Sequence, residues 1–291
     1  MHILLPLFAA IVYVVAALLL KRASDLGADV WRSTRIINYT QALLAVPFWL
    51  LGGTIPSSSL WWQPVIAGLL FFAGQVFTLL ALTTGDVSVA TPVLGLKIVL
   101  VALLSVVLIG DPVGARLWTA AALSSVAITL LNLSPGHSHR RVARTIVLAA
   151  LGAAAYASFD VLVQKFSPVW GTGRFLPLAM ACGAAYSLAL PKGRRDDPTS
   201  PRPYTRWLAG GAMCFAVQGL MFMSAVSIYR QVTSANVLYS SRGLWSVVGV
   251  WAVGHWFTNR EQHLGARVLV WRLIGAILLL AAIVMVLLNS R

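Results

Sequence analysis

Two positively charged residues stand near the middle of segments that are otherwise apolar enough to cross a membrane. Lys97 and Arg242 each lie ten residues after the valine that opens a similar short stretch, VSVAT at 87–91 and VTSAN at 232–236. Burying a cation at the centre of a membrane helix costs roughly 2.5–3.5 kcal/mol on insertion scales. A chain that bears this cost at two equivalent places is expected to use the charges together. The partner that two converging cations attract is an anion.

A structural role for the two cations is the alternative, in which each pairs with a buried acid or extends to the membrane surface. Lys97 lies ten residues from the start of its apolar segment and twelve from its end, too far to reach water unless a cavity meets it. Arg242 is similarly placed. An arginine can donate to two oxygens of a carboxylate or phosphate, and a lysine acts as a compact charge. We therefore favour a substrate cavity.

Asp160 is the only acidic residue inside an apolar run, one helical turn after Tyr156. Both side chains could therefore point into the same cavity, with Tyr156 contacting the substrate. Asp160 could be the counter-ion of Arg242 when substrate is absent, or a carboxylate for proton coupling. A position near the membrane interface, five residues before Lys165, is the alternative and is slightly favoured.

Neutral polar residues in the same segments could orient a substrate through hydrogen bonds. Polar residues in membrane helices often only tie helices together, and for the two glutamines the two roles are equally plausible. Pro92 and Gly95 favour a mild kink with close packing over a break that exposes the backbone. The candidate substrate-binding residues, besides the cations and Tyr156, are Gln75, Gln218, Tyr239, Ser240, Thr91 and Asn236.

The composition is that of a membrane protein with several spans. Only 10% of the 291 residues are charged and the mean hydropathy is +0.82, whereas a soluble domain is about 25% charged. Ten apolar runs approach the ~20 residues that a bilayer core requires. The first lacks the basic start of a signal peptide, so we interpret it as a helix. The runs are 3–20, 34–52, 61–83, 87–109, 116–133, 145–165, 174–190, 206–228, 234–257 and 269–288.

The net charge of +14 does not indicate a nucleic-acid partner, because the lysines and arginines lie in links beside the helix ends. The links after the first, fifth, seventh and ninth runs hold 15 of the 22. By the positive-inside rule these links are cytoplasmic, which places both termini outside the cytoplasm. We expect the plasma membrane of a bacterium, with the lipid bilayer as the surrounding partner.

The chain contains an internal duplication. A polar segment, SPGHSHRR at 134–141, separates five runs from five, which predicts a first repeat at 1–135, a basic linker loop at 136–144 and a second repeat at 145–291. An odd number of spans per repeat requires the second to be inverted, with the substrate near the midplane between them. The predicted fold is all-α, with ten transmembrane helices in two inverted five-helix repeats. Matched residues are Tyr13 with Tyr156, Gln75 with Gln218, and Asp111 with Glu261.

This organisation, with Leu108-Ile109-Gly110-Asp111 after the fourth helix, resembles the drug/metabolite transporter superfamily of the EamA type over essentially the whole chain. The superfamily includes exporters of amino acids and drugs and exchangers of phosphate esters and nucleotide sugars. Residues 234–242 resemble the ninth helix of triose-phosphate translocators, where a Lys-Arg pair binds phosphate. Here Ser241 precedes Arg242, so one of those charges is absent, and Lys97 lies about one turn from the position of their lysine on the fourth helix.

No nucleotide-binding loop, nucleophile motif or metal signature is found, so we expect no enzyme, no cofactor and no metal. His137 and His139 form a lone HxH, and Cys182 and Cys214 form no CxxC pair. A duplicated chain can build its site alone, so a monomer is expected.

The sequence therefore predicts a secondary transporter that moves a small organic anion, a phosphate ester or a carboxylated metabolite, by alternating access. Exchange is attractive because a cavity with two unpaired cations resists closing when empty. If Asp160 neutralises one cation, the empty carrier can close and transport can be proton-linked. The alternatives are an exporter of amino acids or drug-like compounds, and a non-transporting protein that binds acidic lipid.

Overall fold

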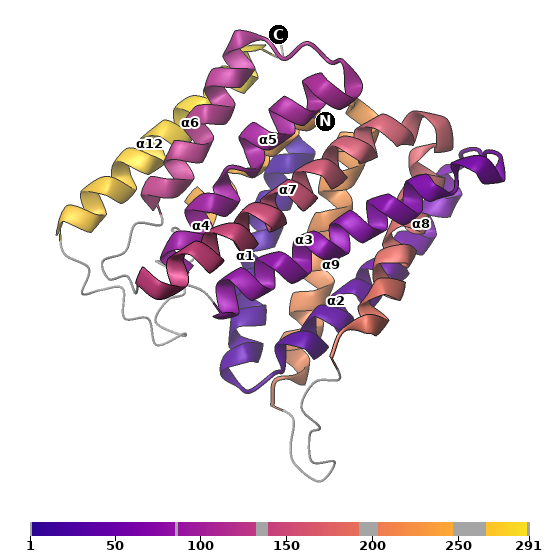
Figure 1. Ribbon diagram of the computed structural model, residues 1–291, viewed down its shortest axis with the longest axis horizontal. Coiled ribbons are helices and arrows are strands. Elements are labelled where there is room, and N and C mark those ends of the chain that lie inside the picture. The colour runs from indigo at the N-terminus through magenta and orange to yellow at the C-terminus, as the bar shows by residue number, and fades with distance from the viewer. Residues whose placement is uncertain (1, 85–86, 132–138, 192–202, 247–265, 290–291) are drawn as a thin grey trace.

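The computed structural model describes residues 2–84, 87–131, 139–191, 203–246 and 266–289, and every regular element in these ranges is a helix (Figure 1). In the first part of the chain the elements are α1 (Leu4–Asp25), α2 (Val30–Ala45), η1 (Val46–Leu51), η2 (Ser58–Leu60), α3 (Trp62–Thr84), α4 (Val87–Gly95), α5 (Lys97–Leu104), η3 (Ser105–Ile109) and α6 (Ala115–Leu131). They are followed by α7 (His139–Trp170), α8 (Thr172–Tyr186), η4 (Ser187–Ala189), α9 (Thr205–Tyr229), α10 (Val232–Tyr239) and α12 (Ala266–Asn289).

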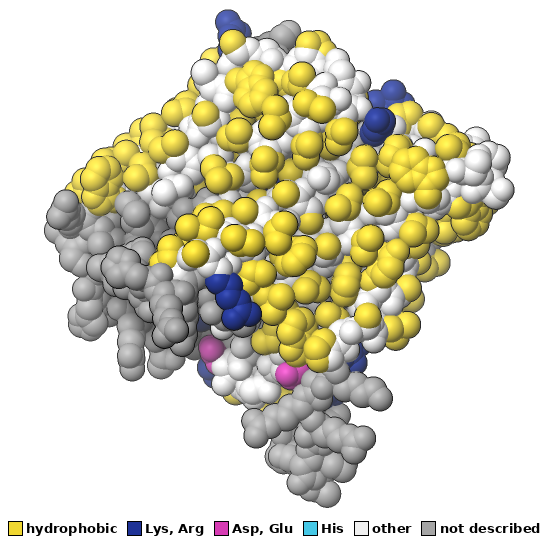
Figure 2. All heavy atoms as spheres, in the orientation of Figure 1, with side chains coloured by type: hydrophobic (Ala, Val, Ile, Leu, Met, Phe, Trp, Pro, Cys, Tyr) yellow, Lys and Arg dark blue, Asp and Glu magenta, His cyan; other side chains and the backbone are white. Residues whose placement is uncertain are grey.

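The protein is an integral membrane protein. In the described part of the chain four segments are long and apolar enough to cross a bilayer: Leu4–Asp25, Ser58–Thr83, Val142–Trp170 and Thr205–Tyr229. Three shorter apolar helices accompany them. The face in Figure 2 is covered mainly by hydrophobic side chains, with most of the charged groups near the ends of the helices. Such an apolar surface is stable against lipid and would be unusual in water.

The helices follow the expected apolar ranges, with one difference that bears on the site. Helix α7 has 32 residues and begins at His139, so most of the linker loop expected at 136–144 is helical. The segment from 139 to 144 contains neither glycine nor proline, and nothing in it stops a helix. Because α7 ends only at Trp170, Asp160 lies ten residues before its end and is 4% exposed. Asp160 is therefore an interior residue of the helical packing, and its slightly favoured position near the membrane interface stays a prediction. The expected range 234–257 is described only as far as Ser246.

The short helices α5 and α10 pack against longer helices and against each other. Helix α1 lies against α9, α3 against α7, and α6 against α12. Helix α5 contacts α6, α7 and α10, and α10 contacts α1, α7 and α9 in turn. The segments that carry Lys97 and Arg242 therefore meet in the interior.

Just before each cation, the backbone forms a tighter turn in which an N–H bonds to the carbonyl three residues back. At Leu96, between α4 and α5, the backbone N–H bonds to the carbonyl of Val93, three residues back. Gly95 packs closely here, because a Cβ on it would lie 2.9 Å from Ile128 on α6, and its carbonyl accepts the Ser125 hydroxyl at 3.0 Å. These contacts agree with the close packing expected at Gly95.

The second tight turn follows α10. The N–H of Ser241 bonds to the carbonyl of Leu238 at 3.1 Å, three residues back, and the helix resumes at Arg242. Tight turns of this kind inside a helix often mark hinges or functional positions.

Candidate functional site

Lys97 and Asp160 form a buried ion pair between α5 and α7. The lysine Nζ lies 2.7 Å from the Asp160 Oδ2, and the two side chains are 16% and 4% exposed. Lys97 is the first residue of α5, and Asp160 comes from the middle of the long helix α7. A buried charge of either sign is costly alone, and each of these two neutralises the other.

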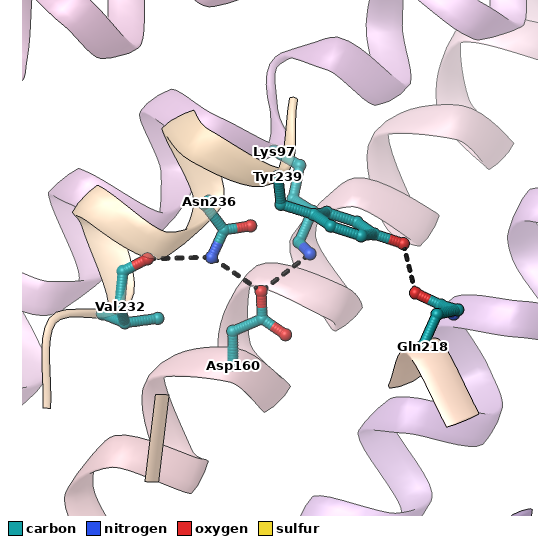
Figure 3. A network of polar contacts seen from close by, with 6 residues as sticks. All are labelled: Lys97, Asp160, Gln218, Val232, Asn236 and Tyr239. Carbon is teal, nitrogen blue, oxygen red and sulfur yellow. Dashed lines mark hydrogen bonds and ion pairs between the residues drawn. The ribbon is translucent and has the colours of Figure 1, made fainter. Parts of the chain in front are cut away.

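Asn236 on α10 holds the same carboxylate from a third side (Figure 3). Its Nδ2 donates to Asp160 Oδ2 at 2.9 Å and to the carbonyl of Val232, one turn earlier, at 3.0 Å. Asn236 is 3% exposed. Asp160 therefore accepts from α5 and α10 at one oxygen, and it ties the two short central helices to α7.

One turn further along α7, Gln164 also connects α7 to α10. Gln164 donates from Nε2 to the Asp111 carboxylate at 3.3 Å, and its Oε1 accepts the backbone N–H of Val232 at 2.7 Å. Gln164 is 5% exposed. It secures the beginning of α10 to the segment after η3. Sequence reasoning missed Gln164, and the available signal was its position four residues after Asp160.

A second buried polar contact joins α10 to α9. The Tyr239 hydroxyl donates to Gln218 Oε1 on α9 at 2.7 Å, and both side chains are buried (Figure 3). The Tyr239 ring lies 4.7 Å from that of Phe222, also on α9. Tyr239 and Gln218, two of the candidate substrate-binding residues, thus contact each other directly.

Arg242 lies between two tyrosine rings. Its guanidinium carbon is 4.7 Å from the ring centroid of Tyr13 on α1 and 4.7 Å from that of Tyr239. Both distances are in the range of cation–π contacts. Among the described residues no carboxylate forms an ion pair with Arg242. The expected counter-ion role of Asp160 towards Arg242 is wrong, because α7 presents that carboxylate to Lys97 on α5.

Lys97 also faces aromatic rings. Its Nζ lies 5.7 Å from the ring centroid of Tyr156 and 5.5 Å from that of Phe222. Tyr156 is held by α3, where a Cβ added to Gly74 would meet its ring at 2.8 Å. Tyr13 and Phe222 were not among the predicted site residues. Tyr13 was recognisable as the match of Tyr156, and Phe222 lies one turn after Gln218 on the same helix.

Two predicted residues, Ser240 and Gln75, lie outside this network of polar contacts. The Ser240 hydroxyl donates to the carbonyl of Val237 at 2.5 Å, so its own helix satisfies it. Gln75 is 8% exposed, and its Oε1 has no hydrogen-bond partner among the described residues. The side chain of Thr91 lies outside the described residues. Ser241, next to Arg242, has a buried hydroxyl that finds no partner in the described part of the chain.

The site so described holds two cations and one carboxylate, walled by tyrosine and phenylalanine rings in the interior of a helical membrane protein. Comparison with known proteins agrees with that class. Residues 1–133 match the EamA-like transporter family. This match confirms the resemblance to the drug/metabolite transporter superfamily over that part of the chain and indicates a membrane transporter, in a family of transporters and not of enzymes.

The fold is also shared with a solved structure, titled "Crystal structure of protein". That structure aligns with 100% of this chain and 97% of its own, with a TM-score of 0.76 and 18% sequence identity. At this identity the likeness extends to the fold alone. Curated protein sequences give no match to the chain.

Proposed function

We propose that the protein is a secondary transporter of a small organic anion, with Arg242 as the group that binds the anionic end of the substrate. The observation that carries this proposal is the contrast between the two interior cations. Lys97 has a carboxylate at 2.7 Å, whereas Arg242 is flanked by the rings of Tyr13 and Tyr239. Its fork of donors is suited to a carboxylate or a phosphate oxygen pair.

The aromatic rings would hold the body of the substrate. The ring centroids of Tyr13 and Tyr239 lie 4.7 Å from the Arg242 guanidinium carbon, and those of Phe222 and Tyr156 lie 5.5 and 5.7 Å from the Lys97 Nζ. Small-molecule sites are typically lined by aromatic and apolar side chains with a few placed polar groups. Gln218 and Asn236 are the polar groups here that could orient the substrate.

Inverted five-helix repeats would supply the motion. In each half a tight turn immediately precedes the cation, at Leu96 and at Ser241. Lys97 meets the ring of Tyr156, and Arg242 meets the ring of its matched residue Tyr13. These paired contacts support a pseudo-two-fold axis between the halves, about which they would rock to open the site to either side.

The Lys97–Asp160 ion pair affects whether the carrier can return without substrate. Because Asp160 neutralises Lys97, the empty site is not left with two unpaired cations, and the physical reason for obligatory exchange is weaker. We propose a carrier that can return empty. Uptake into liposomes containing only buffer would test this point, and strict dependence on substrate inside would contradict it.

Export of amino acids is the second candidate, favoured by the presence of Asp160 in the same site. An amino acid could place its carboxylate on Arg242 and its ammonium group near Asp160. A panel that contains each amino acid beside its deaminated analogue would separate the two candidates, because only this second one requires the ammonium group.

Thermal stabilisation of the purified protein by such a panel tests the proposal. We expect an anion to raise the melting temperature of the wild type and of Gln63→Ala, a polar variant outside the site, but not of Arg242→Ala. Equal stabilisation of all three proteins would contradict the role of Arg242. Stabilisation by acidic phospholipid alone would favour the lipid-binding alternative.

A further inference from the structure

The interior charges are unequally distributed between the two matched halves. The second-half helix α7 places Tyr156 against Lys97 and, one turn later, Asp160 on its Nζ at 2.7 Å. The first-half helix α1 places Tyr13 against Arg242 in the same way. One turn after Tyr13, where α7 has the carboxylate, α1 has Ala17. Among the described residues, a carboxylate therefore neutralises Lys97, and none forms an ion pair with Arg242.

From this asymmetry we infer that the site carries a net charge of +1 and selects substrates with a single negative charge, with Asp160 as the residue that sets this preference. The inference rests on the proposed function and deepens it. A carboxylate or a phosphodiester would fit, whereas a phosphate monoester or a dicarboxylate would bring one charge too many.

The charge count covers the described residues that face the two cations. Helix α5 contributes Lys97, α7 contributes Tyr156 and Asp160, α1 contributes Tyr13, and Tyr239 and Arg242 come from α10 and the turn that follows it. The tyrosines are ordinarily neutral phenols. The remaining polar contacts, from Asn236 and Gln218, carry no charge.

The contacts of Asp160 favour an ion pair with Lys97 that stays intact when substrate binds. Its Oδ2 accepts from Lys97 at 2.7 Å and from Asn236 at 2.9 Å, and the side chain is 4% exposed. Removal of one member of a buried pair leaves an uncompensated charge in the interior. A substrate is therefore expected to bind beside the intact pair and to meet Arg242 as its one unpaired cation among the described residues.

The second charge of a dianion would then be buried without a partner. Such a charge is strongly disfavoured in a medium of low dielectric constant. Wild type is expected to bind a monoanion at least about tenfold more tightly than a dianion of the same shape, a conservative figure for an unpaired buried charge. Monomethyl succinate and succinate form such a pair of probes, and dimethyl phosphate and methyl phosphate form a second.

Three variants separate charge from shape. Asp160→Asn keeps the shape and raises the net charge to +2, so succinate should become the better ligand. The double variant Lys97→Gln with Asp160→Asn leaves Arg242 alone at +1 and should keep the wild-type preference. Asp111→Asn removes a carboxylate that contacts Gln164 and should leave the preference unchanged.

Binding of the four probes to each purified protein, measured by calorimetry, gives the test. A monoanion preference in wild type that reverses in Asp160→Asn supports the inference. If Asp160→Asn does not fold, retention of the preference in the double variant, whose net charge is again +1, supports the inference, and reversal of the preference there would overturn it. Arg242-dependent binding with equal or tighter binding of dianions to wild type would overturn the inference and leave the proposed function standing. Binding of none of the probes in an Arg242-dependent way would overturn the proposed function itself.

Discussion

At the scale of single residues, two similar cations have different surroundings. Arg242 has rings at 4.7 Å on two sides and Lys97 has a carboxylate at 2.7 Å. Arg242→Lys keeps the charge but loses the paired donors. We expect it to bind the anion about tenfold or more weakly than wild type, because a charge-assisted fork is worth roughly 1.5–3 kcal/mol per bond. Calorimetric titration measures this change. Unaltered affinity would mean that charge alone is sensed.

Asp160 provides a second prediction at this scale, on stability. Asp160→Asn should lower the free energy of unfolding by about 3–5 kcal/mol, because Lys97 is then buried without its counter-ion. The double variant Lys97→Gln with Asp160→Asn should recover much of that loss. Thermal melting in detergent reports the difference. A single variant as stable as wild type would show that the 2.7 Å pair contributes little.

At the scale of elements, α7 joins the central helices, and its packing partner α3 determines where Tyr156 lies. A Cβ at Gly74 would meet the Tyr156 ring at 2.8 Å, whereas one at Gly183 would meet Phe71 at an ordinary 3.5 Å. Gly74→Ala should therefore displace the ring and destabilise the protein by about 1–3 kcal/mol. Gly183→Ala, the matched control on α8, should be neutral or slightly stabilising. Equal melting temperatures for the two variants would contradict the close contact.

Gln164 allows a similar test of the link between α7 and α10. Gln164→Ala leaves the backbone N–H of Val232 without the acceptor that now lies at 2.7 Å, which should cost about 1–3 kcal/mol. Ser224→Ala removes a hydroxyl that bonds only within its own helix and should change stability by less than about 0.5 kcal/mol. Hydrogen exchange at the beginning of α10 should rise in the first variant and stay unchanged in the second. No rise there would exclude the proposed link.

At the scale of the whole molecule, hydropathy predicted the helical class and most helix ranges, because the bilayer imposes a length and an apolar composition on each span. The two cations could be found because a buried charge in an apolar run is costly and therefore conspicuous. The partner of Asp160 could not be predicted. Sequence gives the depth of a residue along a helix but not the face that meets a neighbour, and α7 turns Asp160 towards Lys97 and away from Arg242. The extent of α7 was also missed, since its first residues are polar and carry no hydropathy signal.

The central claim is that an anion crosses the membrane bound to Arg242, and uptake into proteoliposomes tests it most directly. The anion that stabilises the purified protein would be supplied in labelled form to liposomes that contain wild type, Arg242→Ala, or Gln63→Ala as the matched control. We predict saturable uptake with wild type and the control, and uptake no greater than that of protein-free liposomes with Arg242→Ala. Uptake by Arg242→Ala at the wild-type rate would contradict the claim, as would binding without any transport by wild type.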